Sequence, residues 1–453
     1  MFRDSSVPVT YGPPCAMSRK VLFVAPSAYP LGGVAVWLDY LCRGLPRTGW
    51  KSVAGLVSGA FHDVAAYQMA YPGLPAEMIR NPTGSREGRI RALIDVIRRV
   101  RPDIVVSVNI RDTYAAVQRL RLDGDPVRAV MALHAIEAPL LHDLRAERKT
   151  IDAVITTNQL ARRLCHVDAQ IDEDRVLYAP YGVDVTDLGA VARSPRATVL
   201  RIVWVGRFDE FQKRVSDLVG ILTQLDALTM DYCMTLVGDG PERASMSASL
   251  AAWTKSGRVV FAGALRSTDL GPSVYANADV LLLTSSWETG PIVIWEAMAA
   301  GVAVVTSRYV GSGLEGALAD DVNCLMFPVG DVKSAAYQLG RLATDNALCQ
   351  RLVKGGQALV ATRYSVEQSV EGWARALDRV AALPSLAAVE TAATPLPAGR
   401  LDRLLGVSAG ETIRRVLGVQ YRHASAGGEW PHTSFTGKVD EAAALRRAGE
   451  LDR

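Results

Sequence analysis

Short apolar runs alternate along the chain with stretches of helical hydrophobic spacing, and this alternation restricts the possible folds more than any other feature of the sequence. Such runs, bounded by turn-forming residues, are typical of strands that are buried on both faces. Strands that alternate with amphipathic helices form parallel sheets covered by helices. The sequence therefore predicts an α/β protein, with strands expected at 21–26, 104–109, 129–134, 152–157, 200–206, 233–238, 259–263, 279–284 and 302–306.

A segment rich in proline, glycine and other turn formers, residues 178–198, separates the expected strands into two series. This composition is typical of a connection between domains, and a chain of 453 residues is long enough for two hydrophobic cores. We therefore predict two Rossmann-like domains whose parallel sheets face a central cleft. The expected parts are a flexible N-terminus at 1–18, a first domain at 19–182, a second domain at 183–383 whose last helix can cross back, and a linker with a short-helix tail at 384–453.

The tail shifts in composition toward alanine, proline and threonine. Within it, Ser408 and Glu411 have the spacing of a capping box, ahead of the apolar residues Ile413, Val416 and Leu417. We therefore expect a linker followed by one or two short helices.

Two glutamates stand eight positions apart in the apolar stretch SSWETGPIVIWEAMAAG, residues 285–301. The stretch follows an expected strand, and ligands of parallel sheets bind at the carboxyl ends of strands. We expect Glu288 in the loop, Pro291 at the first helical position and Glu296 within the helix. Carboxylates in such surroundings need partners, and hydroxyl groups are donors that suit them.

The amides around Gly290, Ile292 and Val293 are expected to form a helix N-terminus, which is a site for anionic oxygens. A sugar nucleotide has hydroxyls at both ends and a diphosphate between them, so it matches an anion site flanked by two carboxylates. Positive charge for the diphosphate is expected from Arg207 and Lys213, which follow the first strand of the second domain.

Several motifs follow one another along the chain in a fixed order. They are the GGV loop at 32–34, PYGVD at 180–184, Gly206-Arg207 with the downstream Lys213, VGDGPE at 237–242, FAGAL at 261–265, and the two glutamates followed by AMAAG at 297–301. In this order and spacing the chain resembles the retaining glycosyltransferases of family 4, of the glycosyl transferases group 1 type, which have the GT-B fold. The resemblance covers roughly residues 20–380.

The resemblance implies that Arg207 and Lys213 hold the donor diphosphate, Glu288 the transferred sugar and Glu296 the ribose. The implied catalytic residues are Glu288, His134, Arg207 and Lys213, and the implied donor-binding residues are Gly32, Gly33, Arg207, Lys213, Gly238, Leu265, Glu288, Gly290, Ile292, Val293 and Glu296. His134 would lie near the sugar and Gly33 beside the phosphates. Two positions depart from the family pattern: Arg214 replaces a common glycine, and Trp295 replaces a smaller apolar residue.

The resemblance also implies a reaction. A sugar would move from a nucleotide diphosphate sugar to an acceptor hydroxyl with retention of configuration, and the leaving phosphate would take the acceptor's proton. The implied acceptor is a sugar or a lipid-linked sugar in polysaccharide or glycoconjugate synthesis, and neither a metal nor a further cofactor is expected. Two alternatives stay open: a sugar-nucleotide epimerase on the same fold, and a non-catalytic protein that binds sugar nucleotides.

Two other motifs suggest different sites. GSGLEG at 311–316 matches the dinucleotide-binding pattern, but the long helix and the acidic residue that should follow it are missing, so a short turn is favoured. Asp123 and Asp125 imitate a DxD metal motif, but they precede an expected strand instead of following one, which favours a surface turn.

Charge and cysteine spacing indicate the setting. A net charge of +3 without basic blocks gives no sign of nucleic-acid binding, and six separated cysteines without CxxC favour a reduced, metal-free cytoplasmic protein. No apolar run is long enough to span a bilayer. The arginines of the amphipathic stretch 89–101 leave open a peripheral contact with the inner face of the membrane, although packing of this helix on the sheet is favoured.

Overall fold

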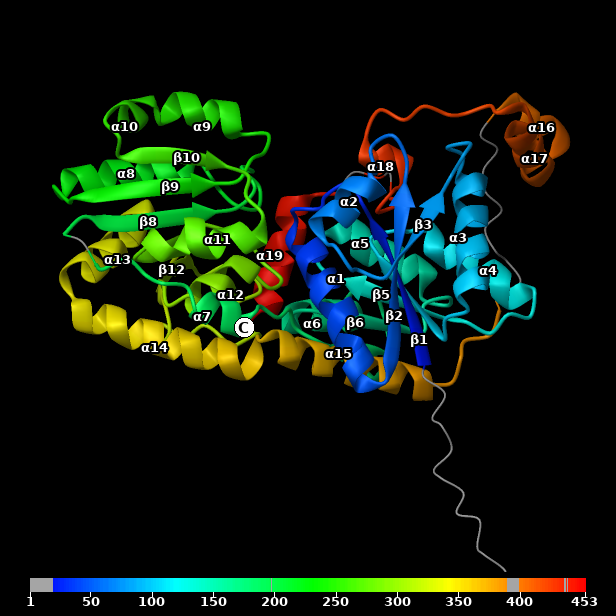
Figure 1. The fold of residues 1–453 in the computed structure, drawn as a ribbon, viewed down its shortest axis with the longest axis horizontal. Helices are drawn as coiled ribbons and strands as arrows, with labels where there is room; N and C mark the ends of the chain where they lie inside the picture. Colours follow the sequence, from blue (N-terminus) through cyan, green and yellow to red (C-terminus); the bar gives the residue numbers. More distant parts are fainter. Residues whose placement is uncertain (1–18, 197, 389–398, 436, 438) are drawn as a thin grey trace, which may run out of the picture.

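The computed structural model describes residues 19–196, 198–388, 399–435, 437 and 439–453, and the expected flexible N-terminus at 1–18 lies outside the described residues. Two sheets of parallel strands, each covered by helices, lie beside one another (Figure 1). The first has the order β3-β2-β1-β4-β5-β6-β7 and the second β10-β9-β8-β11-β12-β13. The predicted α/β fold with two parallel sheets is confirmed.

The first sheet is built from the N-terminal half of the chain. Its strands are β1 (Arg19–Pro26), β2 (Trp50–Ser58), β3 (Ala76–Arg80), β4 (Ile104–Val108), β5 (Arg128–Leu133), β6 (Ala153–Thr156) and β7 (Val176–Tyr178). Its helices are α1 (Gly33–Gly44), α2 (Val64–Ala70), α3 (Arg86–Val100), α4 (Asp112–Leu122), α5 (Ala138–Glu147) and α6 (Gln159–Val167).

The second sheet follows the same plan. Its strands are β8 (Leu200–Val205), β9 (Tyr232–Val237), β10 (Val259–Gly263), β11 (Val280–Leu283), β12 (Ala303–Ser307) and β13 (Leu325–Phe327). Its helices are α7 (Val185–Gly189), α8 (Asp217–Ala227), α9 (Arg243–Ser249), α10 (Ala251–Lys255), α11 (Ser267–Ser273), α12 (Ile292–Ala299), α13 (Val332–Thr344) and α14 (Asn346–Arg363).

Helix α15 (Val366–Ala382) follows the second sheet in the chain but packs on the first. Its fully buried Trp373 contacts the rings of Phe23 and Trp37, and both of those residues belong to the first domain's core. The chain therefore returns to the first domain after building the second.

Four strands, β2, β3, β7 and β13, are absent from the strands expected from the sequence, and β13 is a three-residue strand at the edge of the second sheet. β2 carries Lys51, Ser52 and Gly55 within its length, and these residues interrupt the apolar run that marks a buried strand. β3 and β7 are short, only partly buried, and lie at the two edges of the first sheet. Edge strands need less apolar sequence, because one side of the strand has no neighbour.

The described residues of the tail contain four helices and not the one or two expected: α16 (Arg400–Leu405), α17 (Val407–Leu417), α18 (Ala426–Glu429) and α19 (Glu441–Leu451). The predicted capping box is wrong: α17 follows Gly406 without a side-chain cap, and Ser408 lies inside the helix. Glu411 is fully buried, where Thr83 and Ser85 donate hydrogen bonds to its carboxylate. These two partners are distant in sequence, so the local sequence pattern could not predict that Glu411 points toward them.

The arginines of α3 are engaged within the protein. Arg89 pairs with Asp112, Arg91 donates to Ser408 of the tail, and Arg98 pairs with Asp123 and Asp125. This agrees with the expectation that the helix packs on the sheet. The arginines form ion pairs and hydrogen bonds with other parts of the same chain. Among the described residues, no helix is long and apolar enough to cross a membrane.

Candidate active site

A cavity of about 360 Å³ lies between the two domains, at the carboxyl ends of β8, β9 and β10 and beside the start of α1. Its lining contains every predicted donor-binding residue except Glu288 and Gly290. These residues are Gly32, Gly33, Arg207, Lys213, Gly238, Leu265, Ile292, Val293 and Glu296. Residues up to 264 positions apart in sequence are thus brought to one cavity, from Gly32 to Glu296.

Two glycines of the cavity lie close to other parts of the chain, Gly33 against a side chain and Gly238 against the backbone. A Cβ atom on Gly33 would lie 3.0 Å from Cδ1 of Ile292, so the start of α1 faces the start of α12 across the cleft. Gly238 has a φ of +127°, and a Cβ atom there would lie 1.9 Å from the carbonyl oxygen of Gly206. Only glycine fits this position.

Glu288 is buried behind the cavity and is surrounded by donors. Its Oε1 atom lies 2.5 Å from Lys213 Nζ and accepts a hydrogen bond from Ser285 Oγ at 2.6 Å. Gln212 Nε2 donates to Oε2 at 3.3 Å. The two residues to which the sequence assigned separate roles, Lys213 and Glu288, therefore form one ion pair.

Arg207 has a different environment, because its side chain is 62% exposed. Among the residues that the structure describes, its one ion pair is with Asp209 of the same loop, at 3.1 Å. An exposed guanidinium on a loop at the cavity mouth can turn toward an anionic ligand without breaking a buried contact.

Glu296 lies within α12, one turn inside the helix, and is 4% exposed. Ser267 Oγ donates to its Oε1 atom at 2.6 Å, and the Tyr275 hydroxyl donates to Oε2 at 3.2 Å. Burial raises the pKa of Glu296 to about 7, because the charged form loses its hydration, while the two hydroxyl donors oppose the shift. The carboxyl thus changes charge near neutral pH.

The helix begins at Ile292 with Pro291 as its N-cap, so the predicted helical position of Pro291 is wrong by one residue.

His134 follows β5 and is buried beside the loop that carries Glu288. Its Nδ1 atom is hydrogen-bonded to the Tyr181 hydroxyl at 2.6 Å, and its backbone oxygen accepts from Thr289 Oγ1 at 2.5 Å. Among the described residues its Nε2 atom has no hydrogen-bond partner. Burial lowers the pKa of His134 to about 3, so the ring is neutral at physiological pH and can offer Nε2 to a ligand hydroxyl.

Gly290 lies directly against Tyr181. Its φ is +131°, and a Cβ atom there would lie 2.7 Å from the Tyr181 ring. The ring of Tyr181 also stacks on His134, with 5.6 Å between the ring centroids. Tyr181 therefore joins the loop after β11 to the first domain's histidine.

Several residues of the site were missed by sequence reasoning. Tyr181 lies in the PYGVD motif, and this motif could have identified it. The hydroxyl donors to the two glutamates have no sequence signal, because serine and tyrosine occur throughout such chains. These donors are Ser267, Tyr275 and Ser285.

The two rival motifs lie outside this cavity. The amides of Gly311, Gly313 and Leu314 bind the carboxylate of Asp452, which follows α19, so the GSGLEG loop holds a side chain of the tail. Asp123 and Asp125 are half-exposed and pair with Arg98, as the surface-turn interpretation expects. No group of three metal-ligating side chains occurs in the part of the chain that the structure describes.

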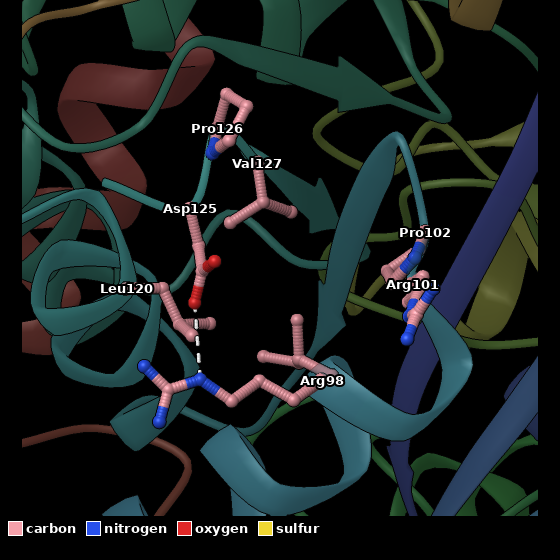
Figure 2. A pocket seen from close by; sticks show the side chains of 8 residues that line it. Arg98, Arg101, Pro102, Leu120, Asp125, Pro126 and Val127 are labelled. Carbon is pink, nitrogen blue, oxygen red and sulfur yellow. Dashed lines mark hydrogen bonds and ion pairs between the residues drawn. The ribbon is translucent and has the colours of Figure 1, made fainter. Parts of the chain in front are cut away.

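A second cavity, of about 550 Å³, lies near the starts of β4 and β5, lined by Pro102 and Val127 among others. Figure 2 shows Asp125 directed toward Arg98 at this cavity, with 3.0 Å between Oδ2 and Nε. Ligands of parallel sheets bind at the opposite ends of the strands. This cavity is therefore not part of the candidate site.

The arrangement combines three chemical capacities in one cleft. Arg207 and Lys213 offer positive charge, the starts of α1 and α12 offer backbone amides, and the two glutamates accept hydrogen bonds. A ligand with an anionic centre and hydroxyl groups on both sides matches this set.

Comparison with known proteins agrees with this chemistry. The family model described as glycosyl transferases group 1 matches residues 200–345, and this match confirms the resemblance to group 1 glycosyltransferases. LpsE of Rhizobium meliloti (strain 1021), a lipopolysaccharide core biosynthesis glycosyltransferase, is 30% identical over 39% of this chain and 49% of its own length. The 2-deoxystreptamine N-acetyl-D-glucosaminyltransferase of Streptomyces fradiae is 28% identical over 52% of this chain and 58% of its own. The chain thus spans about half the length of these curated relatives.

Solved structures share the fold over a longer range. HepE of Anabaena, solved in complex with UDP and glucose, superimposes with a TM-score of 0.65 over 80% of this chain and 99% of its own, at 20% identity. A glycosyltransferase from Rickettsia africae gives a TM-score of 0.66 over 81% of this chain and 100% of its own, at 13% identity. The GT-B arrangement of the two domains is therefore shared with these proteins.

Proposed function

We propose that this protein is a glycosyltransferase that moves a sugar from a nucleotide diphosphate sugar to an acceptor hydroxyl with retention of configuration. The observation that carries the proposal is the interdomain cavity, which is lined by Lys213, paired with the buried Glu288, and by the buried Glu296. The group 1 match over residues 200–345 supports it, because these residues supply most of the cavity lining.

The proposed donor pose follows from the chemistry of the lining. Glu296 would accept hydrogen bonds from the ribose, Arg207 and Lys213 would bind the diphosphate, and Glu288 with His134 would hold the transferred sugar. The start of α1 at Gly33 would add backbone amides to the phosphates. Leu265, Ile292 and Val293 supply apolar surface around these polar groups.

The proposed reaction needs no protein nucleophile. The bond between the anomeric carbon and the phosphate oxygen breaks, the acceptor oxygen bonds to the same face of the sugar, and the acceptor's proton passes to the leaving phosphate. Negative charge grows on the diphosphate during this step, and Arg207 and Lys213 would stabilise it. His134, neutral at physiological pH, would orient a sugar hydroxyl through Nε2 without exchanging a proton.

The acceptor side is assigned to the first domain, whose loops at the carboxyl ends of its strands face the same cleft. A sugar or lipid-linked sugar is the proposed acceptor class, in polysaccharide or glycoconjugate synthesis. LpsE is named for lipopolysaccharide core biosynthesis, and this makes a saccharide acceptor a reasonable first choice. We propose a cytoplasmic location for this activity.

A nucleotide-release assay tests the proposal and its alternatives. The full chain is incubated with nucleotide diphosphate sugars, beginning with UDP-glucose, the ligand of a solved HepE complex. Free nucleotide and sugar products are measured with and without saccharide acceptors, in excess chelator. Acceptor-dependent release with an α-linked product from an α-linked donor is expected. Acceptor-independent release with an epimerised sugar would favour the epimerase, and binding without release would favour the non-catalytic protein.

A further inference from the structure

Helices α16 and α17 form a hairpin at the outer end of the first domain, remote from the second domain (Figure 1). The hairpin rests on α3, where Arg91 donates to the backbone oxygen and the hydroxyl of Ser408. Its placement lies outside the candidate active site, and the family pattern ends before it begins. The hairpin therefore needs its own explanation.

The face of the hairpin that turns toward the protein is polar. Glu411 is fully buried and accepts hydrogen bonds from Thr83 and Ser85 of the first domain. The Arg414 side chain is 3% exposed and is paired with Asp402 of α16. An amphipathic helix on a globular protein normally turns its charged residues outward, so α17 is reversed relative to this rule.

Five aliphatic side chains of the hairpin and its end are exposed to solvent. Leu404 and Leu405 end α16, Val416 and Leu417 end α17, and Val419 follows. Their exposed fractions are 81%, 53%, 80%, 69% and 48% respectively. Single exposed apolar residues are ordinary, but five on one hairpin whose charged residues Asp402, Glu411 and Arg414 are buried indicate a surface that binds a partner.

The exposed charges of residues 399–425 are of one sign. Residues 399–425 contain two carboxylates, Asp402 and Glu411, and both are buried toward the protein. Arg400, Arg403 and Arg422 are exposed. The solvent-facing side of the hairpin therefore combines aliphatic side chains with cations and presents no carboxylate from these residues.

We propose that the α16–α17 hairpin docks on an anionic lipid bilayer. Exposed leucines and valines at helix ends would enter the boundary between head groups and acyl chains, and the arginines would bind lipid phosphates. A second copy of the chain is disfavoured as the occupant, because the exposed arginines of two such hairpins would repel each other. A fluid bilayer also accepts protruding side chains without needing a shaped partner.

Vesicle co-sedimentation with the full chain tests this proposal without any catalytic readout. Vesicles of phosphatidylcholine and phosphatidylglycerol in equal parts should pellet the protein, whereas vesicles of phosphatidylcholine alone should pellet about tenfold less. The double variant Leu404→Ser/Leu417→Ser and the double variant Arg400→Glu/Arg403→Glu should each lose about tenfold of the binding to anionic vesicles. Leu228→Ser, which changes a leucine that is 55% exposed on the second domain, is the matched control and should bind like the wild type.

Three outcomes of the co-sedimentation would overturn the proposal: equal binding to both kinds of vesicle, no binding to anionic vesicles, or unchanged binding by both double variants. A thermal melt of each variant confirms folding, since the changed residues are exposed and their replacement should leave the melting temperature unchanged. Sedimentation equilibrium without lipid tests the other occupant. A concentration-dependent dimer that the leucine variant abolishes would assign the surface to a second copy instead. None of these readouts depends on sugar transfer, so failure here leaves the proposed function untouched.

Discussion

Arg207 and Lys213 supply the positive charge of the candidate site, but their surroundings differ sharply. The Arg207 side chain is 62% exposed and pairs only within its own loop, with Asp209. The Lys213 side chain is 14% exposed and neutralises a Glu288 carboxylate that is 7% exposed. Removing the two charges should therefore affect folding differently, although both are proposed to act on one diphosphate.

We expect Arg207→Ala to lower kcat/KM by about a hundredfold, since losing one donor to a growing negative charge raises the barrier by about 3 kcal/mol. Its melting temperature should match the wild type, because exposed ion pairs contribute little to stability. Steady-state kinetics and a thermal melt measure the two effects. Arg99→Ala, which removes an exposed arginine paired with Glu77 far from the cavity, is the control. Near-normal turnover of Arg207→Ala would remove Arg207 from the diphosphate site.

Lys213→Ala should lower both activity and stability. The change leaves the buried Glu288 carboxylate without its cation, and breaking a buried ion pair by removing one partner costs about 3 kcal/mol or more. The double variant Lys213→Ala/Glu288→Gln removes the uncompensated charge, so it should recover most of the lost free energy of unfolding while remaining inactive. Denaturant titrations of both variants decide this point. Equal stability of the single and double variants would contradict the proposed energetic link between the two residues.

Glu296 should couple nucleotide binding to pH. Its pKa is about 7 in the folded protein and near the ordinary 4.5 in the unfolded chain, so the folded state holds the proton more tightly. The free energy of unfolding should therefore fall by about 3 kcal/mol from this group as pH rises from about 4.5 to above 7. Ribose hydroxyls favour the charged carboxylate, so nucleotide affinity should rise over the same pH range.

The variant Glu296→Gln isolates this effect. At pH 8, where the wild-type carboxylate is charged, the variant should bind nucleotide about tenfold more weakly, because a neutral acceptor makes a weaker hydrogen bond. At pH 6, where the wild-type group is largely protonated, the two affinities should nearly agree. Titration calorimetry at the two pH values measures this. An affinity difference that does not change with pH would contradict the assignment of Glu296 to the ribose.

At the scale of elements, the candidate site depends on the positions of the loops that follow β8 and β9. The exit of β9 at Gly238 passes so close to the exit of β8 at Gly206 that no side chain fits between them. This contact brings two loops of the cavity together. Gly257, by contrast, also has a positive φ of +76° but has open space where a Cβ atom would lie.

We expect Gly238→Ala to destabilise the protein by several times more than Gly257→Ala. The Gly257 change brings only the backbone cost of a left-handed residue, about 1 kcal/mol. The Gly238 change adds a clash with the carbonyl of Gly206, and the loops must separate to relieve it. Urea unfolding of the two variants compares them directly. A similar loss of stability in both variants would show that the β8 and β9 exits are free to move apart.

At the scale of the whole molecule, the two domains are joined in two separate ways after the second sheet is complete. Helix α15 returns to the first domain's core through Trp373. Helix α19 lies between the domains in Figure 1, packing on α6 of the first domain, and Asp452 after it binds amides of the loop at Gly311 in the second. The tail is therefore a structural bridge across the cleft.

We expect Asp452→Ala to weaken this bridge. The change leaves three buried or partly buried amides without their acceptor and should lower the free energy of unfolding by about 2 kcal/mol or more. It should also broaden the calorimetric unfolding transition, as the domains lose one of their couplings. Asp452→Asn, which keeps an oxygen acceptor but loses the charge, should lie between the variant and the wild type. An unchanged transition in Asp452→Ala would show that α15 alone couples the domains.

The sequence by itself determined the two parallel sheets, and it predicted a ligand site in the cleft between them. Buried strands can be predicted from local apolar runs. Ligands of parallel sheets bind at the carboxyl ends of the strands, so the predicted strands also predict where a ligand binds. Gly33 and Gly238 were named from the sequence as donor-binding residues, but the close approach of Gly238 to the Gly206 carbonyl oxygen came only from the structure. Where the local pattern was weak, as in β2 with its lysine, serine and glycine, the prediction failed.

Only the tertiary structure decided the charge state and the partners of the site residues. That Glu288 pairs with Lys213 and that Glu296 titrates near neutrality both depend on burial and on hydroxyl donors from distant segments. The reversal of α17 has the same origin: its spacing favours an apolar buried face, but Glu411 is satisfied by Thr83 and Ser85, which lie 328 and 326 positions away. Desolvation and long-range partners depend on the whole fold, so no local pattern can specify them.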